Sequence, residues 1–416
     1  MSEASIAKAS WLKNADLQTL LSVLSTDGEE ARIAGGAVRN ALLGETVTDI
    51  DIATTNLPEA VISRAQDAGF KTVPTGMEHG TITVIADGTP YEVTTLRADI
   101  ETDGRHARVE FGRDWKRDAE RRDFTINGMY AEADGQVVDL VGGLGDLQSR
   151  TLRFIGEADE RIREDYLRIL RFFRFFAWYG AGRPDAEGIK ASARLKAGLD
   201  GLSAERVWSE LRRLLSAPDP SRALLWMRQT GVLTRVLPES EKWGIDAVPG
   251  LVDAEGIEGW KPDPLLRLAA IVPPDGKRLA GLAERLKLSN AEADKLQAWA
   301  NAATPAAACS EAELARIAYR GKMGGIDDRM RLALASAQAK TDADTAARYR
   351  HLLGFLSSWE QPVMPLTGND LLAAGLMPGK ALGAILKSLE SEWVESNFSL
   401  NRDALLKRAA ELAAQT

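Results

Sequence analysis

Two short stretches, Gly35-Gly-Ala-Val-Arg39 and Thr48-Asp-Ile-Asp51, decide how the first part of the chain is interpreted. The first follows a strand-like run and precedes a helical pattern, so its two glycines are expected to form a strand-to-helix turn. Glycines at such a turn let the backbone approach a phosphate, and the helix N-terminus adds N–H donors. We therefore expect Gly35, Gly36 and Arg39 to face one anion. The alternative is a tight turn whose arginine meets a surface carboxylate.

The second stretch carries two carboxylates on an expected strand over residues 49–53. Because side chains alternate along a strand, Asp49 and Asp51 would leave the same face, with Cα atoms about 6.5 Å apart. Two such carboxylates repel unless a cation lies between them, and Mg²⁺ is the natural occupant in nucleotidyl transfer. Two solvated aspartates at a strand end are the alternative. Turn and carboxylates together are more specific than either alone, since one would hold a triphosphate and the other its metal ions.

The composition limits the classes of protein to which the chain can belong. With 416 residues, a net charge of −8, 45% hydrophobic and 27% charged residues, the chain is typical of a globular protein of about two to four domains. We expect no signal peptide and no membrane span, because neither a basic-apolar start nor a long apolar run occurs. One cysteine argues against a disulfide scaffold and indicates the reducing cytoplasm. The acidic balance argues against indiscriminate nucleic-acid coating but leaves a local basic patch possible.

The patterning divides the chain into a mixed front part and a helical remainder. We expect an α+β protein with a small mixed-sheet head over residues 1–145, a helical neck over 146–235, and a helical body and tail over 236–416. Residues 81–86 and 91–96 are β-rich and flank a turn, which predicts a hairpin. Residues 98–114 are polar and contain glycine, and are interpreted as a mobile loop. The stretch 105–122, which begins with Arg105, has a local charge of roughly +3 and is expected to be a flexible basic loop that is placed to hold RNA. A merely solvated loop is the alternative.

The segment Glu164-Asp-Tyr-Leu-Arg-Ile-Leu-Arg-Phe-Phe-Arg174 is predicted to be one amphipathic helix. Asp165 and Arg168 are three residues apart and would share a face of that helix, with Arg171 and Arg174 continuing the row. Taken alone, the pattern is also typical of a surface helix with acid–arginine pairs.

Several motifs follow one another in an order that is typical of one family. They are Gly35–Arg39, Thr48–Asp51, Glu78–Val84, Tyr91–Arg97, Arg121–Asn127, Gly142–Leu147 and Glu164–Arg168. With them the sequence resembles class II tRNA nucleotidyltransferases and bacterial poly(A) polymerases, which belong to the DNA polymerase β-like nucleotidyltransferase superfamily. The resemblance covers residues 30–235 strongly and the C-terminal half loosely. It implies a polymerase-β-like nucleotidyltransferase head.

For the transfer step, the resemblance implies that Asp49 and Asp51 hold Mg²⁺ next to the triphosphate. Glu92, on an adjacent strand, is the candidate third carboxylate, which completes the metal site or takes the proton of the attacking 3′-hydroxyl. A surface glutamate of the hairpin is the alternative for Glu92. Arg121 and Arg122 are implied to contact the triphosphate.

For the choice of base, the resemblance implies that the 164–174 segment is an amino-acid template. Asp165 would accept a hydrogen bond from the exocyclic amine of cytosine or adenine, and Arg168 would donate to the neighbouring ring acceptors. Guanine and uracil place a carbonyl where Asp165 needs an amine, and unpaired polar groups of this kind cost ~1–3 kcal/mol each. Arg171 and Arg174 would meet the triphosphate or position the reading pair, and Glu164 would orient Arg168.

The function implied is that of a CCA tRNA nucleotidyltransferase, which adds CMP and AMP to the tRNA 3′ end from CTP and ATP and releases pyrophosphate. The partner would be the 3′ end and acceptor arm of tRNA. A poly(A) polymerase, or a partial enzyme that adds only C or only A, is the near alternative because it shares every motif.

Two more distant alternatives are weighed against this function. Intact Asp49 and Asp51 argue against a catalytically dead RNA-binding protein. The helical extension of about 180 residues argues against an enzyme that nucleotidylates small molecules, which would not need it. We expect no metal phosphohydrolase domain with a His-Asp pair, because the three histidines precede Gly80, Ala107 and Leu352. The motifs carry no information on the oligomeric state.

Overall fold

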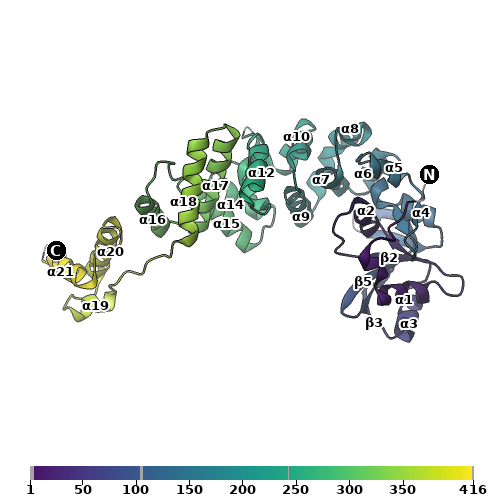
Figure 1. Ribbon diagram of the computed structural model, residues 1–416, viewed down its shortest axis with the longest axis horizontal. Coiled ribbons are helices and arrows are strands. Elements are labelled where there is room, and N and C mark those ends of the chain that lie inside the picture. The colour runs from purple at the N-terminus through teal and green to yellow at the C-terminus, as the bar shows by residue number, and fades with distance from the viewer. Residues whose placement is uncertain (1–3, 104–105, 242, 415–416) are drawn as a thin grey trace. The chain divides into compact units, whose positions relative to one another are not determined.

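The computed structural model describes residues 4–103, 106–241 and 243–414 (Figure 1). The described chain forms two compact units, Met1–Pro238 and Glu239–Thr416. The first contains a mixed β-sheet followed by helices, and the second is helical, so the α+β class and the helical remainder are confirmed. Within these residues, no helix is both long and apolar enough to cross a bilayer.

The head is built on a seven-stranded mixed sheet with the strand order β3-β4-β5-β2-β1-β8-β9. The pairing of β2 with β5 is parallel and the other pairings are antiparallel. The predicted hairpin is confirmed as β4 and β5. The strands are β1 (Ala31–Ala34), β2 (Asp51–Thr54), β3 (Lys71–Gly76), β4 (Thr81–Ala86), β5 (Thr89–Thr95), β8 (Met129–Ala131) and β9 (Val137–Asp139).

Helices α1 (Ala15–Leu24) and α3 (Pro58–Asp67) lie side by side against this sheet (Figure 1). Helix α1 begins where the Asn14 side chain accepts the N–H groups of Asp16 and Leu17. It then buries four leucines at the spacing of one helical face, which is the pattern of a helix packed on a core. Those leucines are Leu17, Leu20, Leu21 and Leu24.

The predicted mobile loop over residues 98–114 is wrong as a description of the backbone. Strands β6 (Arg97–Asp103) and β7 (His106–Phe111) form a separate antiparallel pair, with Arg97 opposite Phe111 and Asp103 opposite His106. Inter-strand hydrogen bonds satisfy the backbone of such a ribbon, so it needs no apolar run in its sequence. Arg105, which was counted in the basic loop, lies outside the described residues.

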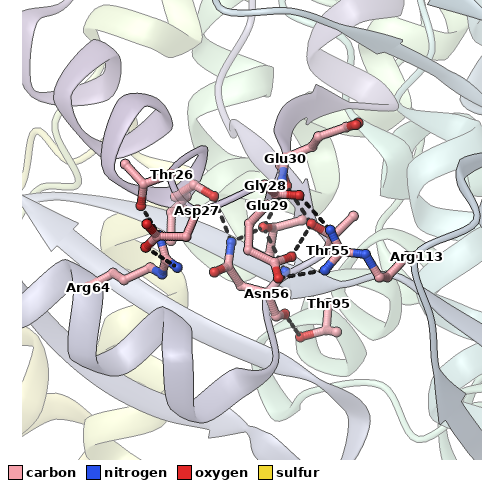
Figure 2. A network of polar contacts seen from close by, with 12 residues as sticks. Thr26, Asp27, Gly28, Glu29, Glu30, Thr55, Asn56, Arg64, Thr95 and Arg113 are labelled. Atoms are coloured by element: carbon pink, nitrogen blue, oxygen red, sulfur yellow. Dashed lines mark hydrogen bonds and ion pairs between the residues drawn. The ribbon is translucent and has the colours of Figure 1, made fainter.

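A network of polar contacts fastens the chain just after β7 to the residues that precede β1 and follow β2 (Figure 2). Arg113 donates to the Glu29 carboxylate and to the Gly28 carbonyl, both at 2.5 Å, and Thr55 donates to the other Glu29 oxygen at 2.5 Å. The Thr55 hydroxyl and Arg113 hold the pKa of Glu29 below its usual value. Buried Asn56 ties the same region to the end of α1 through the Leu24 carbonyl (2.7 Å).

The neck helices follow the head within the first unit and share an aromatic core. The Phe154 and Phe172 rings stack at 5.4 Å between centroids, and Phe124 packs on both. The helices of this unit beyond those already given are α2 (Gly36–Leu43), α4 (Trp115–Glu120), α5 (Gly143–Gln148), α6 (Ala158–Glu164), α7 (Leu167–Tyr179), α8 (Ala186–Leu195), α9 (Ala204–Leu215), α10 (Ser221–Gln229) and α11 (Val232–Val236).

The single helix predicted from Glu164 to Arg174 is broken at Asp165. Helix α6 ends at Glu164, Asp165 is extended (φ −155°, ψ 107°), and α7 begins at Leu167. The Asp165 carboxylate accepts the Leu167 N–H at 3.1 Å. Short polar side chains that bond to the nearby backbone compete with helical hydrogen bonding, which explains why apolar periodicity alone did not indicate the break.

The second unit consists of packed helices with a small apolar cluster near its end. Leu371, Leu389, Trp393 and Leu405 are fully or almost fully buried there, and Tyr319 of α16 packs against the cluster. The helices are α12 (Ala247–Glu258), α13 (Pro264–Ile271), α14 (Gly276–Arg285), α15 (Asn290–Asn301), α16 (Glu311–Arg320), α17 (Met323–Ala339), α18 (Ala343–Ser358), α19 (Gly368–Ala373), α20 (Lys380–Glu395) and α21 (Arg402–Ala413).

We expect Asp328→Asn to stabilise the protein at pH 7. Burial raises the pKa of Asp328 from 3.8 to about 6, with Lys295 opposing the shift and Asp263 adding to it. The folded state therefore holds a proton that the unfolded state releases, so stability falls as the pH rises from about 4 to about 6. Removing this carboxylate should raise the free energy of unfolding at pH 7 by roughly 2–3 kcal/mol, and by almost nothing near pH 4.

Urea unfolding of the full chain at both pH values measures this effect. Asp327→Asn is the matched control, since Asp327 is half-buried and pairs with Arg331 at 2.6 Å. If the free energy of unfolding of Asp328→Asn is still higher than that of wild type at pH 4, the electrostatic cause is contradicted.

Candidate active site

A cleft of about 550 Å³ lies in the first unit between the turn after β1, the end of α4, and helices α7 and α9. All of the residues predicted to bind the nucleotide line this cleft, although they come from distant parts of the sequence. The lining residues are Gly35, Gly36, Arg39, Arg121, Arg122, Asp123, Asn127, Asp165, Leu167, Arg168, Arg171, Arg174, Phe175, Arg206 and Arg213.

The glycine turn has the predicted form, with β1 ending at Ala34 and α2 beginning at Gly36. Gly35 has a φ of +62°, a region that favours glycine. A Cβ atom at Gly35 would lie 3.1 Å from Nη1 of Arg122 and 3.3 Å from the Asn127 carbonyl oxygen. The turn therefore lets the backbone come close to one of the cleft arginines, which a larger residue would obstruct.

Arg39 lines the cleft, but its guanidinium is already bonded to other side chains. This corrects the expectation that it faces a bound anion as a free cation. Its side chain donates to Asn127, to Asn40 (2.9 and 3.0 Å) and to the Tyr179 hydroxyl (2.8 Å). The guanidinium lies 4.0 Å from the centre of the Tyr179 ring, and burial lowers the pKa of Arg39. Arg39 thus links the head to α7, and its partner Tyr179, 140 residues away, had no signal in the sequence.

Arg121 and Arg122 share one buried carboxylate, that of Asp118. Asp118 is 1% exposed and accepts from Arg121 (2.8 Å), Arg122 (3.2 Å) and the Tyr130 hydroxyl (2.6 Å). Burial alone would raise the pKa of Asp118, but the two guanidinium groups outweigh it and hold the pKa below its usual value. The sequence analysis missed Asp118, although its spacing of three and four residues from the arginines is a recognisable signal on a helix.

Asp165 and Arg168 are each paired with a different residue. One carboxylate oxygen of Asp165 accepts from Arg206 of α9 at 2.5 Å, while the other caps α7. Arg168 forms an ion pair with Glu164 and donates to the Arg161 carbonyl at 2.9 Å. The cleft therefore presents an acceptor and a donor side by side, each held in place from outside the pair.

Arg171 and Arg174 are also anchored by buried acids. Arg171 donates to Asp123 at 2.7 Å, and Arg174 donates to Glu210 at 2.5 Å. Burial would raise the pKa of Asp123, but Arg171 outweighs it and lowers the pKa. Phe175 lies under the Arg174 guanidinium at 4.1 Å. Asp123 and Glu210 thus fix the direction of two cleft cations.

The candidate metal ligands lie at the start of β2. The strand begins at Asp51 rather than at Asp49, so the expected strand over 49–53 is shorter, and the exposed Asp49 precedes it. Glu92 on β5 is directly opposite Asp51 in the parallel pairing. Asp51 is exposed at the start of the strand, yet partial desolvation by the surrounding protein and then Glu92 raise its pKa, while Arg122 opposes the rise and Asp49 adds to it.

This mutual repulsion of the acids is suited to a bound cation. In the part of the chain that the structure describes, three or more acidic, histidine or cysteine side chains are nowhere gathered into a ready-made metal cluster. Mg²⁺ commonly uses one or two carboxylates together with substrate phosphates, so Asp49 and Asp51 fit such a shared site. The electrostatic influence of Arg122, a cleft residue, on Asp51 connects these acids to the cleft.

Comparisons with known proteins agree with this geometry. Residues 31–153 match the family model of the poly A polymerase head domain, and residues 185–243 match a probable RNA and SrmB-binding site of polymerase A. The mitochondrial CCA tRNA nucleotidyltransferase 1 of Mus musculus is 35% identical, over 94% of this chain and 88% of its own length. A CCA-adding enzyme of Leuconostoc mesenteroides is 30% identical, over 95% and 96% of the two chains.

A solved structure shares the same arrangement. The Bacillus stearothermophilus CCA-adding enzyme in complex with CTP has a TM-score of 0.72 and 25% sequence identity, and the match covers 96% of this chain and 97% of that one. The chain therefore belongs to the nucleotidyltransferase family that comprises the CCA-adding enzymes and the poly(A) polymerases.

Proposed function

We propose that this protein is a CCA tRNA nucleotidyltransferase, which transfers CMP from CTP and AMP from ATP to the 3′ end of tRNA and releases pyrophosphate. The observation that carries the proposal is that one cleft gathers a glycine turn, an arginine cluster and an acid–arginine reading pair. Arg122 of this cleft also acts electrostatically on Asp51, at the start of β2. The names of the full-length relatives support it.

Base selection is proposed to rest on Asp165 and Arg168. A carboxylate accepts from the exocyclic amine of cytosine or adenine, and a guanidinium donates to the ring acceptors beside it. Guanine and uracil would leave Asp165 facing a carbonyl. Arg206 and Glu164 would keep the two reading groups apart, because an ion pair between Asp165 and Arg168 would cancel both.

Triphosphate binding is proposed for the glycine turn with Arg121 and Arg122, while Arg171 and Arg174 position the nucleotide. Asp49 and Asp51 would hold Mg²⁺, which when bound lowers the pKa of the attacking hydroxyl and neutralises developing charge. The tRNA 3′-oxygen then bonds to the α-phosphorus as the bond to the leaving pyrophosphate breaks. Glu92, opposite Asp51, is placed to take the hydroxyl proton or to complete the metal site.

The head over residues 1–145 and the neck over 146–235 are proposed to hold the nucleotide and the tRNA 3′ end, and the helical body and tail over 236–416 are proposed to bind RNA. The helical second unit offers a surface far larger than a free nucleotide would need. We place the enzyme in the cytoplasm, in keeping with its single cysteine.

The test uses tRNA that lacks CCA, with CTP and ATP supplied separately and together. We expect CTP alone to add only cytidines, and both nucleotides together to complete CCA and then stop, with UTP and GTP poorly used. Sequencing of the product ends measures this. Long adenosine tracts without cytidine would show a poly(A) polymerase instead, and transfer to a small acceptor but not to RNA would show a small-molecule enzyme.

A further inference from the structure

Eight arginines line the cleft, and Arg213 differs from the other seven in its side-chain contacts. Among the described residues, Arg39, Arg121, Arg122, Arg168, Arg171, Arg174 and Arg206 all bond to side chains of the protein. The Arg213 side chain is exposed and has no such partner in that part of the chain. Its charge acts on Arg174. Burial, Arg171 and then Arg213 lower the pKa of Arg174, and Glu210 opposes them.

An exposed indole contacts the backbone of the residue that carries this cation. Trp178 is 40% exposed, which is unusual for so large an apolar side chain. Its Nε1–H donates to the backbone carbonyl of Arg213 at 2.9 Å, so one edge of the ring is fixed. Trp178 follows Arg171 by seven residues and Arg174 by four, which places it on the face of α7 that lines the cleft.

We propose that Trp178 and Arg213 form a docking site for the single-stranded 3′ end of the RNA acceptor. The indole stacks on a nucleobase, and the guanidinium binds a backbone phosphate. An aromatic ring beside a cation is the usual means of holding single-stranded nucleic acid. The inference rests on the proposed function, because it needs an RNA acceptor.

Stacking also matches a requirement of stepwise addition. The terminal base of the acceptor changes after each nucleotide is added, so the group that holds the end must accept different bases. Stacking is tolerant of sequence because every base has a π-face, whereas hydrogen bonding to base edges is not. The incoming nucleotide has Asp165 and Arg168 for its base, which leaves Trp178, one turn beyond Arg174, for the acceptor.

The test compares Trp178→Phe with Trp178→Leu, and Arg213→Gln with Arg213→Lys. Both Trp178 variants lose the indole N–H and keep an apolar side chain, but only phenylalanine can stack. We expect Trp178→Leu to weaken the binding of tRNA that lacks CCA by tenfold or more, and Trp178→Phe to retain most of it. Arg213→Gln should weaken RNA binding and reduce its salt dependence by about one phosphate contact, and Arg213→Lys should restore it. The matched control is Arg183→Gln, at an exposed arginine of the same neck.

Equilibrium RNA binding without nucleotide and the KM for CTP separate the outcomes. We expect the dissociation constants for RNA to change and the KM for CTP to stay within about twofold of the wild-type value. If Trp178→Leu and Trp178→Phe bind RNA equally, the proposed docking site is wrong. It is also wrong if only the KM for CTP rises, and that result would assign Trp178 and Arg213 to the incoming nucleotide. Failure of the wild-type protein to extend tRNA would refute the proposed function instead. The extension of tRNA that lacks CCA measures this separately.

Discussion

Asp51→Asn should lower kcat roughly a thousandfold while the protein stays folded, because metal-assisted stabilisation of the phosphoryl centre is worth several kcal/mol. The substitution keeps the size of the side chain and removes the charge that would hold Mg²⁺. Partial desolvation and the neighbouring Glu92 already raise the pKa of Asp51, so the fold does not depend on this carboxylate being ionised. The loss is therefore expected in turnover rather than in stability.

Single-turnover incorporation of labelled CMP into tRNA, with a thermal melt of the same sample, measures both quantities. Asp87→Asn is the control, since Asp87 is an exposed aspartate in the β4–β5 turn of the same head. Turnover that is unchanged in Asp51→Asn would revive the alternative of an RNA-binding protein without this chemistry.

Asp118→Asn should destabilise the protein by about 3–5 kcal/mol and raise the KM for CTP and ATP together. The cost arises because Arg121 and Arg122 would keep their positive charges in a partly buried place after losing the negative one. Both arginines line the cleft, so their displacement would also disturb proposed triphosphate binding. Equal effects on CTP and ATP are expected because the triphosphate is common to both.

The pH dependence of this effect has a definite sign. The pKa of Asp118 is held below its usual value of 3.8, so its contribution to stability is complete above about pH 4 and is lost as the pH falls through the folded-state pKa. Urea unfolding at pH 7 should show the full difference from wild type. Glu120→Gln, an exposed change on the same helix whose ion pair with Lys116 is 3.8 Å long, should cost no more than about 1 kcal/mol. A similar loss in both variants would contradict the role of Asp118.

The prediction of the β6–β7 segment failed for a physical reason. Pairing alone satisfies the backbone of a two-stranded ribbon, so its sequence can be as polar as that of a loop, and only the pairing of Arg97 with Phe111 and the following positions reveals it. The break at Asp165 was missed in a similar way, since the apolar residues around it keep helical spacing while the Asp165 carboxylate caps α7.

The sequence by itself determined what depends on neighbouring residues. The glycine turn, the β4–β5 hairpin and the outward direction of Glu92 between buried Tyr91 and Val93 follow from local conformational preferences and strand alternation, which act over a few residues. Nine of the fifteen residues that line the cleft followed from the family resemblance of the motifs, whereas Arg206 and Arg213 of α9 did not.

The Arg168–Glu164 pair was expected from its spacing, but only the tertiary structure decided the partners that lie far away in the sequence. Arg206 meets Asp165 across 41 residues, Arg39 meets Tyr179 across 140, and the backbone carbonyl of Arg213 fixes Trp178 across 35. Contacts of this kind depend on how helices α2, α7 and α9 pack, and side-chain periodicity carries no information about a partner on another element. Such packing sets the direction of Asp165 and Arg39, which is why residues of the site could be named from the sequence but these parts of their geometry could not.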